Sequence, residues 1–111
     1  MELKLIGDKR TLLVQIDGEL DHHVAARVRE AVDARIKSTN ARNIAFDFRN
    51  VTFMDSSGIG VIMGRYKIAK TLGGKVLIFG AGAQIKRIIV MSGIDKIVRL
   101  ADTLEEALQQ I

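Results

Sequence analysis

The chain has 111 residues, which is enough for one hydrophobic core but not for two, so we expect a single domain over residues 1–111. Hydrophobic residues make up 48% and charged residues 27% of the chain, and no apolar run is long enough to span a bilayer, so we predict a soluble protein with no membrane span and no signal peptide. The 17 basic residues outnumber the 13 acidic ones but are spread between them, so we expect no nucleic-acid binding, and the absence of cysteine suits a cytoplasmic location.

The first forty residues predict a β-hairpin followed by a helix. Apolar and polar residues alternate on both sides of the turn residues 7–10. From His22 onward, apolar residues recur at helical spacing until about residue 38. Asp21 stands directly before this helix and is placed to cap its first turn.

The rest of the chain alternates predicted strands and helices. In order, we expect a strand over 44–48, a helix from Asp55 to Gly73, a central strand over 76–79, a short helix ending at Gly93, a strand over 97–100, and a final helix begun by Thr103 and Glu106. Strands separated by helices predict parallel pairing with right-handed crossovers, and the hairpin adds an antiparallel edge. This order predicts an α/β domain.

The segment 54–60, Met-Asp-Ser-Ser-Gly-Ile-Gly, places two hydroxyls beside a carboxylate where an apolar strand ends and a helix begins. A helix start exposes unpaired N–H groups and the positive end of the macrodipole, so a phosphate can be added there with little refolding. Capping of the helix by Asp55, Ser56 or Ser57 is the alternative interpretation. Two hydroxyls and a carboxylate exceed what one cap needs, so the segment also predicts a charge switch.

Two glycines follow the serines. We interpret Gly58 and Gly60 as residues that leave the backbone next to Ser56 uncovered, so that a kinase active site can approach closely. Each costs roughly 1 kcal/mol in a helix interior, which indicates a steric reason for its presence. Three basic residues of the same helix are expected to lie on its solvated face: Arg65, Lys67 and Lys70.

Other kinds of chemistry have weaker support. Asp55 could be an aspartyl-phosphate acceptor as in response-regulator receivers, but the early strands offer only Asp17 as a further acid. The glycine-rich residues 80–82 lack the Lys-Ser/Thr end of a P-loop and the third glycine of a dinucleotide fingerprint. His22 and His23 are adjacent, so they point in different directions and do not form a metal pair. We therefore expect no enzyme, and no catalytic, cofactor or metal site.

Segment 54–60 resembles the phosphorylation site of the STAS-domain anti-sigma-factor antagonists of spore-forming bacteria. Segment 18–23, Gly-Glu-Leu-Asp-His-His, resembles the sporulation (sigma-F) branch of that family, and segments 64–67 and 91–94 agree in kind and order. The resemblance implies a STAS-type domain over residues 1–111. It also implies a mixed four- to five-stranded sheet with about four helices mainly on one side, and Ser56 at the start of the helix after the third strand.

The resemblance further implies a phosphorylation-controlled partner switch. The dephosphorylated chain, a monomer when free, would bind an anti-sigma factor that is also an ATP-dependent serine kinase, and would thereby release the sporulation sigma factor. Phosphorylation of Ser56 by that kinase would prevent binding, and a metal-dependent serine phosphatase would reverse it. The kinase binds the ATP, so no cofactor is expected here. The implied docking residues are Asp21, which would face a basic residue of the partner, and Asp55, Ser56, Ser57, Gly58, Ile59 and Gly60.

Two alternatives remain open. One is a general-stress partner-switching antagonist with a different kinase and sigma factor. The other is a regulatory STAS domain that senses a nucleotide or lipid through residues 80–82. Segment 80–84 is more glycine-rich than in many relatives and lacks the proline that they carry, so partner contacts there are expected to differ.

Overall fold

The computed structural model describes all 111 residues. Strands β1 (Glu2–Ile6) and β2 (Thr11–Leu20) pair in antiparallel orientation, as predicted for the opening hairpin. The connecting turn has positive φ angles at Gly7, Asp8 and Lys9. This left-handed conformation reverses the chain within a few residues.

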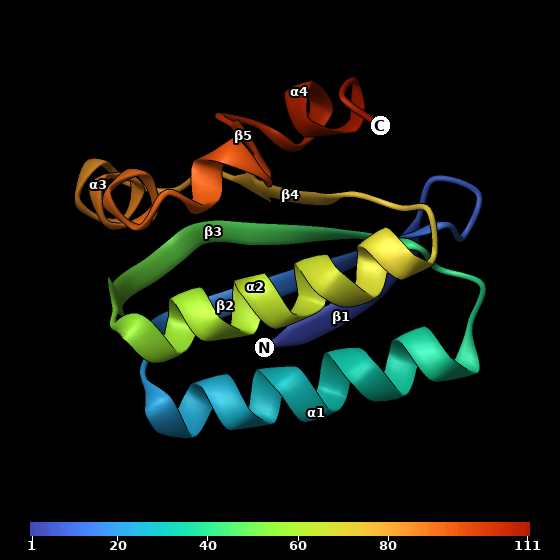
Figure 1. Cartoon of the computed structure of the whole chain (residues 1–111), viewed down its shortest axis with the longest axis horizontal. Helices are drawn as coiled ribbons and strands as arrows, with labels where there is room; N and C mark the ends of the chain where they lie inside the picture. Colours follow the sequence, from blue (N-terminus) through green and yellow to red (C-terminus); the bar gives the residue numbers. More distant parts are fainter.

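Helices and strands alternate after the hairpin (Figure 1). The elements are α1 (His22–Ser38), β3 (Asn43–Met54), α2 (Ser56–Thr71), β4 (Val76–Phe79), α3 (Ala83–Ser92), the 3-10 helix η1 (Ile94–Lys96), β5 (Arg99–Ala101) and α4 (Leu104–Leu108). The five strands lie in the sheet in chain order, and every pair after the hairpin is parallel. The predicted α/β fold with an antiparallel edge is confirmed.

Two strands differ from the prediction in their boundaries. β3 continues to Met54 instead of ending near residue 48, because β2 runs beside it all the way and two register shifts absorb the irregular pairing. β5 begins at Arg99 instead of residue 97. The N–H groups of Ile97 and Val98 both donate to the carbonyl of Ile94, so these residues complete the turn after η1.

The sheet separates a large core from a small one. Helices α1, α2 and α3 cover one face, where they pack on inward side chains such as Phe46 and Ile78. On the other face, Ala107 of α4 packs against Leu77 and Phe79. Three helices therefore lie on one side and α4 on the other, which agrees with the predicted arrangement.

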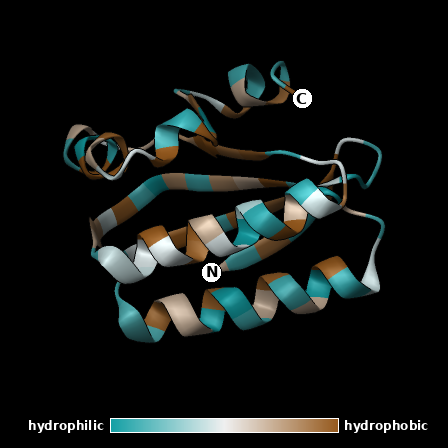
Figure 2. Ribbon diagram, viewed as in Figure 1, coloured by the Kyte–Doolittle hydropathy of each residue, from teal (hydrophilic) through white to brown (hydrophobic).

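Figure 2 shows hydrophilic and hydrophobic residues mixed along α1 and α2, as expected for helices with one buried face. None of the helices is both long and apolar enough to cross a membrane.

The parallel pairing of β2 with β3 fixes where α1 and α2 begin. Leu20, the last residue of β2, pairs with Met54, the last residue of β3. A single residue, Asp21 or Asp55, separates each strand end from the helix that follows it. Figure 1 shows α1 and α2 side by side, running in the same direction from the same end of the sheet. Leu20 and Met54 are 34 positions apart in the sequence (54 − 20), and the segments that they end thus meet at one edge of the sheet.

Candidate functional site

The candidate site is the edge of the sheet formed by the carboxyl ends of β2 and β3, where two aspartates cap two neighbouring helices. Asp21 accepts a hydrogen bond at 3.0 Å from the backbone N–H of Val24 in the first turn of α1. Asp55 accepts one at 2.8 Å from the backbone N–H of Ser57 in the first turn of α2. Both carboxylates satisfy helix N–H groups that would otherwise lack a partner. The predicted cap by Asp21 is confirmed.

Asp21 is held in its charged form. The hydrogen bond from the Val24 N–H lowers the pKa of its carboxyl below the usual value, and His23 and Arg27 lower it further, whereas partial burial opposes the change. A carboxylate accepting a backbone N–H at a helix start is stabilised as an anion. The site therefore presents a fixed negative charge one residue before α1.

The two serines occupy different surroundings at the start of α2. Of the three candidate caps, Asp55, Ser56 and Ser57, it is Asp55 that caps the helix, and neither serine does. Ser56 is the first residue of the helix and is exposed, whereas Ser57 is half-buried. The Ser56 hydroxyl is therefore at the surface and is not required to hold the helix end together.

The two glycines also differ, and the interpretation of Gly58 is wrong. Gly58 is buried, and a Cβ there would overlap the Met54 side chain and come within 3.1 Å of Leu20 Cδ2. Its lack of a side chain serves internal packing and does not leave the backbone uncovered. Gly60 is exposed with open space around its Cα, in agreement with the prediction. The inclusion of Gly58, Ile59 and Gly60 in a docking segment stays a prediction.

Arg65 does not lie on the solvated face of α2, contrary to the prediction. It is 6% exposed, and its Nε lies 3.1 Å from Oδ1 of Asp33 on α1. Burial lowers the pKa of the Arg65 guanidinium, Asp33 opposes this change, and the nearby charge of Arg29 adds to it. Lys67 and Lys70 are exposed as predicted. Arg65 is thus a buried charge in the contact between α1 and α2.

The glycine-rich turn at residues 80–82 has a structural explanation. Gly80 has a φ of 76°, which favours glycine, and a Cβ there would overlap the side chain of Arg49. Gly82 precedes α3 and makes no side-chain cap. Turn geometry and close packing account for Gly80, whereas Gly82 has an ordinary φ of −67° and open space around it. The predicted role of the segment in sensing a nucleotide or lipid stays an alternative.

The fold and sequence can be compared with known proteins. A model of the STAS domain matches residues 2–107. An anti-sigma F factor antagonist from Paenibacillus polymyxa is 34% identical over 111 residues, which cover 100% of this chain and 95% of the relative. The anti-sigma factor antagonist SpoIIAA, solved in its unphosphorylated form, is 26% identical with a TM-score of 0.85, covering 98% of this chain and 93% of that one.

The phosphorylated form of the Bacillus cell fate determinant SpoIIAA is also similar. It has a TM-score of 0.76 at 26% identity and covers 98% of this chain and 96% of its own. The match to the STAS model extends over almost the whole sequence, and the five-stranded sheet with its helices agrees with these solved structures. The protein therefore belongs to the STAS-domain family.

Proposed function

We propose that this protein is an anti-sigma-factor antagonist whose binding is controlled by phosphorylation of Ser56. In its dephosphorylated form it binds an anti-sigma factor that is also a serine kinase, and a sigma factor is released. The kinase transfers phosphate from ATP to Ser56, and a metal-dependent serine phosphatase removes it. The chain itself acts by binding and is not an enzyme. Its place of action is the cytoplasm, where sigma factors meet RNA polymerase.

One observation carries this proposal. Ser56 is exposed at the first residue of α2, its hydroxyl is not needed as a cap, and α1 with its cap Asp21 begins at the same edge of the sheet. A kinase can therefore reach the hydroxyl, and a partner that covers this edge meets Asp21 and Ser56 together. The relative SpoIIAA was solved in phosphorylated and unphosphorylated forms, which supports a modification of this kind.

A phosphate on Ser56 would change the charge of the edge while the fold stays the same. It adds about −1.5 to −2 charges at neutral pH. Backbone N–H groups and the macrodipole at the start of α2 favour that charge within the free protein. In an interface, the same charge must lose its water next to the carboxylates of Asp21 and Asp55, so binding weakens.

The sporulation (sigma-F) pathway is favoured over general stress. The Paenibacillus polymyxa relative at 34% identity is an anti-sigma F factor antagonist. The pair His22 and His23 after Gly-Glu-Leu-Asp also resembles the sporulation branch.

Phosphopeptide mass spectrometry after incubation with an anti-sigma F kinase and ATP tests the proposal. We expect one phosphate per chain, on Ser56. Ser56→Ala should remain unmodified and should still bind the anti-sigma factor, because removal of one exposed hydroxyl leaves the rest of the edge intact.

Ser57→Ala is the matched control, because it removes the neighbouring hydroxyl from the same helix turn. It should still accept one phosphate per chain, on Ser56. If Ser56→Ala incorporated phosphate as fast as the wild type and Ser57→Ala did not, Ser57 would be the acceptor and the assignment of Ser56 would be wrong.

A further inference from the structure

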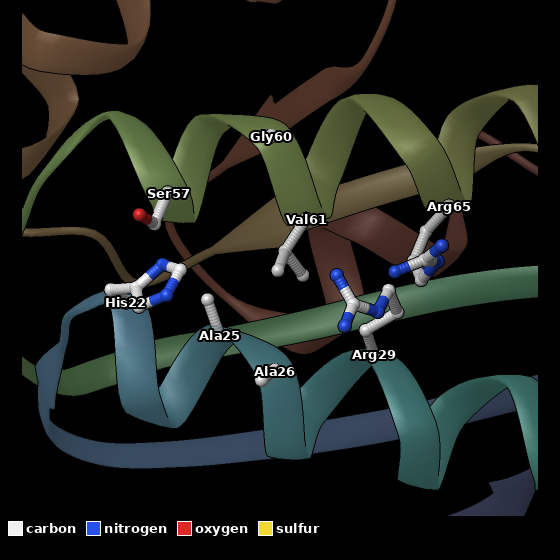
Figure 3. A pocket seen from close by; sticks show the side chains of 8 residues that line it. All are labelled: His22, Ala25, Ala26, Arg29, Ser57, Gly60, Val61 and Arg65. Carbon is white, nitrogen blue, oxygen red and sulfur yellow. The ribbon is translucent and has the colours of Figure 1, made fainter.

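A groove of about 380 Å³ runs between α1 and α2, beside the edge described above but distinct from the Ser56 hydroxyl. Figure 3 shows His22 and Ser57 at one end of the groove and Arg29 and Arg65 at the other. Helical spacing explains this layout, because residues three, four, seven or eight positions apart share one face of a helix. Ser57 lines the groove, whereas Ser56 does not.

Small residues keep the groove open. Ala25 and Ala26 line it from α1, and Gly60 lines it from α2. A Cβ at Gly60 would meet no atom within 4 Å, so no side chain fills the space between α1 and α2 at this position. The volume lies at the lower end of the range of about 300–1,000 Å³ that is usual for small-molecule sites.

The arginine end of the groove has more donors than acceptors. Arg65 is 6% exposed, and its Nη1 is buried without a hydrogen-bond partner in the chain. Its ion pair with Asp33 has Nε and Oδ1 at 3.1 Å, yet neither atom makes a hydrogen bond. Arg29 places a second positive charge nearby, close enough to lower the pKa of Arg65. Asp33 is the ion-pair partner of Arg65, and no acidic residue lines the groove beside Arg29 and Arg65. A buried charged donor without an acceptor is costly.

We infer that the groove between α1 and α2 binds a small phosphomonoester, with the phosphate at Arg29 and Arg65. Guanidinium groups match the oxygens of phosphate with several parallel N–H donors, and a dianion supplies the charge and acceptors that this end lacks. The far end offers the Ser57 hydroxyl and the His22 ring to a polar group of the same molecule. The ligand is therefore longer than inorganic phosphate and carries hydrogen-bonding groups away from its phosphate.

Isothermal titration calorimetry of the whole unphosphorylated chain at constant ionic strength tests this inference, with inorganic phosphate and glycerol 2-phosphate as probes. We expect saturable binding of one molecule per chain, with tighter binding of glycerol 2-phosphate because its hydroxyl groups extend from the phosphate along the groove, where inorganic phosphate has none. Arg29→Gln should weaken binding by about tenfold or more, since a charge-assisted hydrogen bond is lost. Arg65 is left in place because its removal would leave Asp33 unpaired between the helices.

Two variants separate a specific site from general charge attraction. Arg27→Gln removes the same charge from an exposed residue of α1 that does not line the groove, and it should leave binding unchanged. Ala26→Leu keeps every charge but fills the groove, and it should abolish binding. Thermal melts followed by circular dichroism establish that each variant is folded.

The inference is overturned if neither probe binds saturably, or if Arg27→Gln weakens binding as much as Arg29→Gln. Equal affinities for the two probes would overturn the assignment of a longer ligand. The titration uses no kinase and no sigma factor. Its outcome is therefore independent of the function proposed above.

Discussion

At the scale of single residues, Gly58 and Gly60 have opposite surroundings although they stand two positions apart in α2. Gly58 is buried against Met54 and Leu20, and there is no room for a methyl group. Gly60 borders the open groove, where a methyl group would meet nothing. The pattern Gly-x-Gly therefore has two separate causes, one in core packing and one in the shape of the surface.

We predict that Gly58→Ala and Gly60→Ala change stability in opposite directions. Overpacking costs about 1–3 kcal/mol, and alanine recovers about 1 kcal/mol of helix propensity, so Gly58→Ala should lower the free energy of unfolding by about 1 kcal/mol. Gly60→Ala should raise it by roughly 0.5–1 kcal/mol. Urea unfolding of the two variants measures both. If Gly58→Ala proved as stable as Gly60→Ala, the packing explanation for Gly58 would be wrong.

The burial of Arg65 could not be predicted from its neighbours in the sequence. An arginine between polar and apolar neighbours on an amphipathic helix is ordinarily solvated, and this predicts an exposed side chain. Its burial depends on Asp33, which lies on another helix and is brought close only by the packing of α1 on α2. The cap at Asp21 was predictable, and the cap of α2 could be narrowed to Asp55, Ser56 or Ser57, because a cap depends on neighbours within three residues.

At the scale of elements, the start of α2 separates two tasks between adjacent residues. Asp55 caps the helix with its carboxylate, and Ser56 carries an exposed hydroxyl in the first turn. The helix end thus remains satisfied whether or not the hydroxyl is modified. A negative group added to this turn interacts favourably with the macrodipole.

We predict that Ser56→Asp weakens binding to the anti-sigma factor without destabilising the domain. A carboxylate in the first turn should stabilise α2 by about 0.3–1 kcal/mol, whereas the same charge in an interface is unfavourable. Thermal unfolding and titration with the anti-sigma factor measure the two effects separately. If the melting temperature fell together with the affinity, the added charge would act by unfolding the domain, and the prediction would be wrong.

Thr71→Asp is the control for this prediction, because it adds the same charge at the other end of the same helix. Thr71 is exposed in the last turn of α2. A negative charge there opposes the macrodipole, so stability should fall by about 0.3–1 kcal/mol while affinity stays unchanged. The two variants should therefore show opposite patterns of stability and binding.

Element boundaries were less predictable than element order. The strand predicted over 44–48 continues to Met54 beside β2. Strand length depends on the neighbouring strand, and register shifts near Gly18 are needed to keep the pair together. Such pairing information is not contained in the local pattern. The alternation of strands and helices, in contrast, was sufficient to predict the parallel sheet.

At the scale of the whole molecule, the parallel sheet joins two helix starts into one surface. Because Leu20 pairs with Met54, the caps Asp21 and Asp55 each follow a strand end at the same edge. No local feature of the sequence places Asp21 near Ser56. The proximity comes from strand order, and it makes a docking surface from two distant segments physically possible.

We predict that Asp21→Ala lowers affinity for the anti-sigma factor by at least about tenfold, because the loss of the carboxylate would leave a basic group of the partner unpaired in the interface. Thr103→Ala is the matched control. Thr103 caps α4 through a 3.2 Å hydrogen bond from the Glu106 N–H, on the opposite face of the sheet from α1. Both variants lose one cap bond and should lose comparable stability, but only Asp21→Ala should lose affinity. If both variants bound as tightly as the wild type, Asp21 would be a helix cap alone, and the docking surface would be centred on the start of α2.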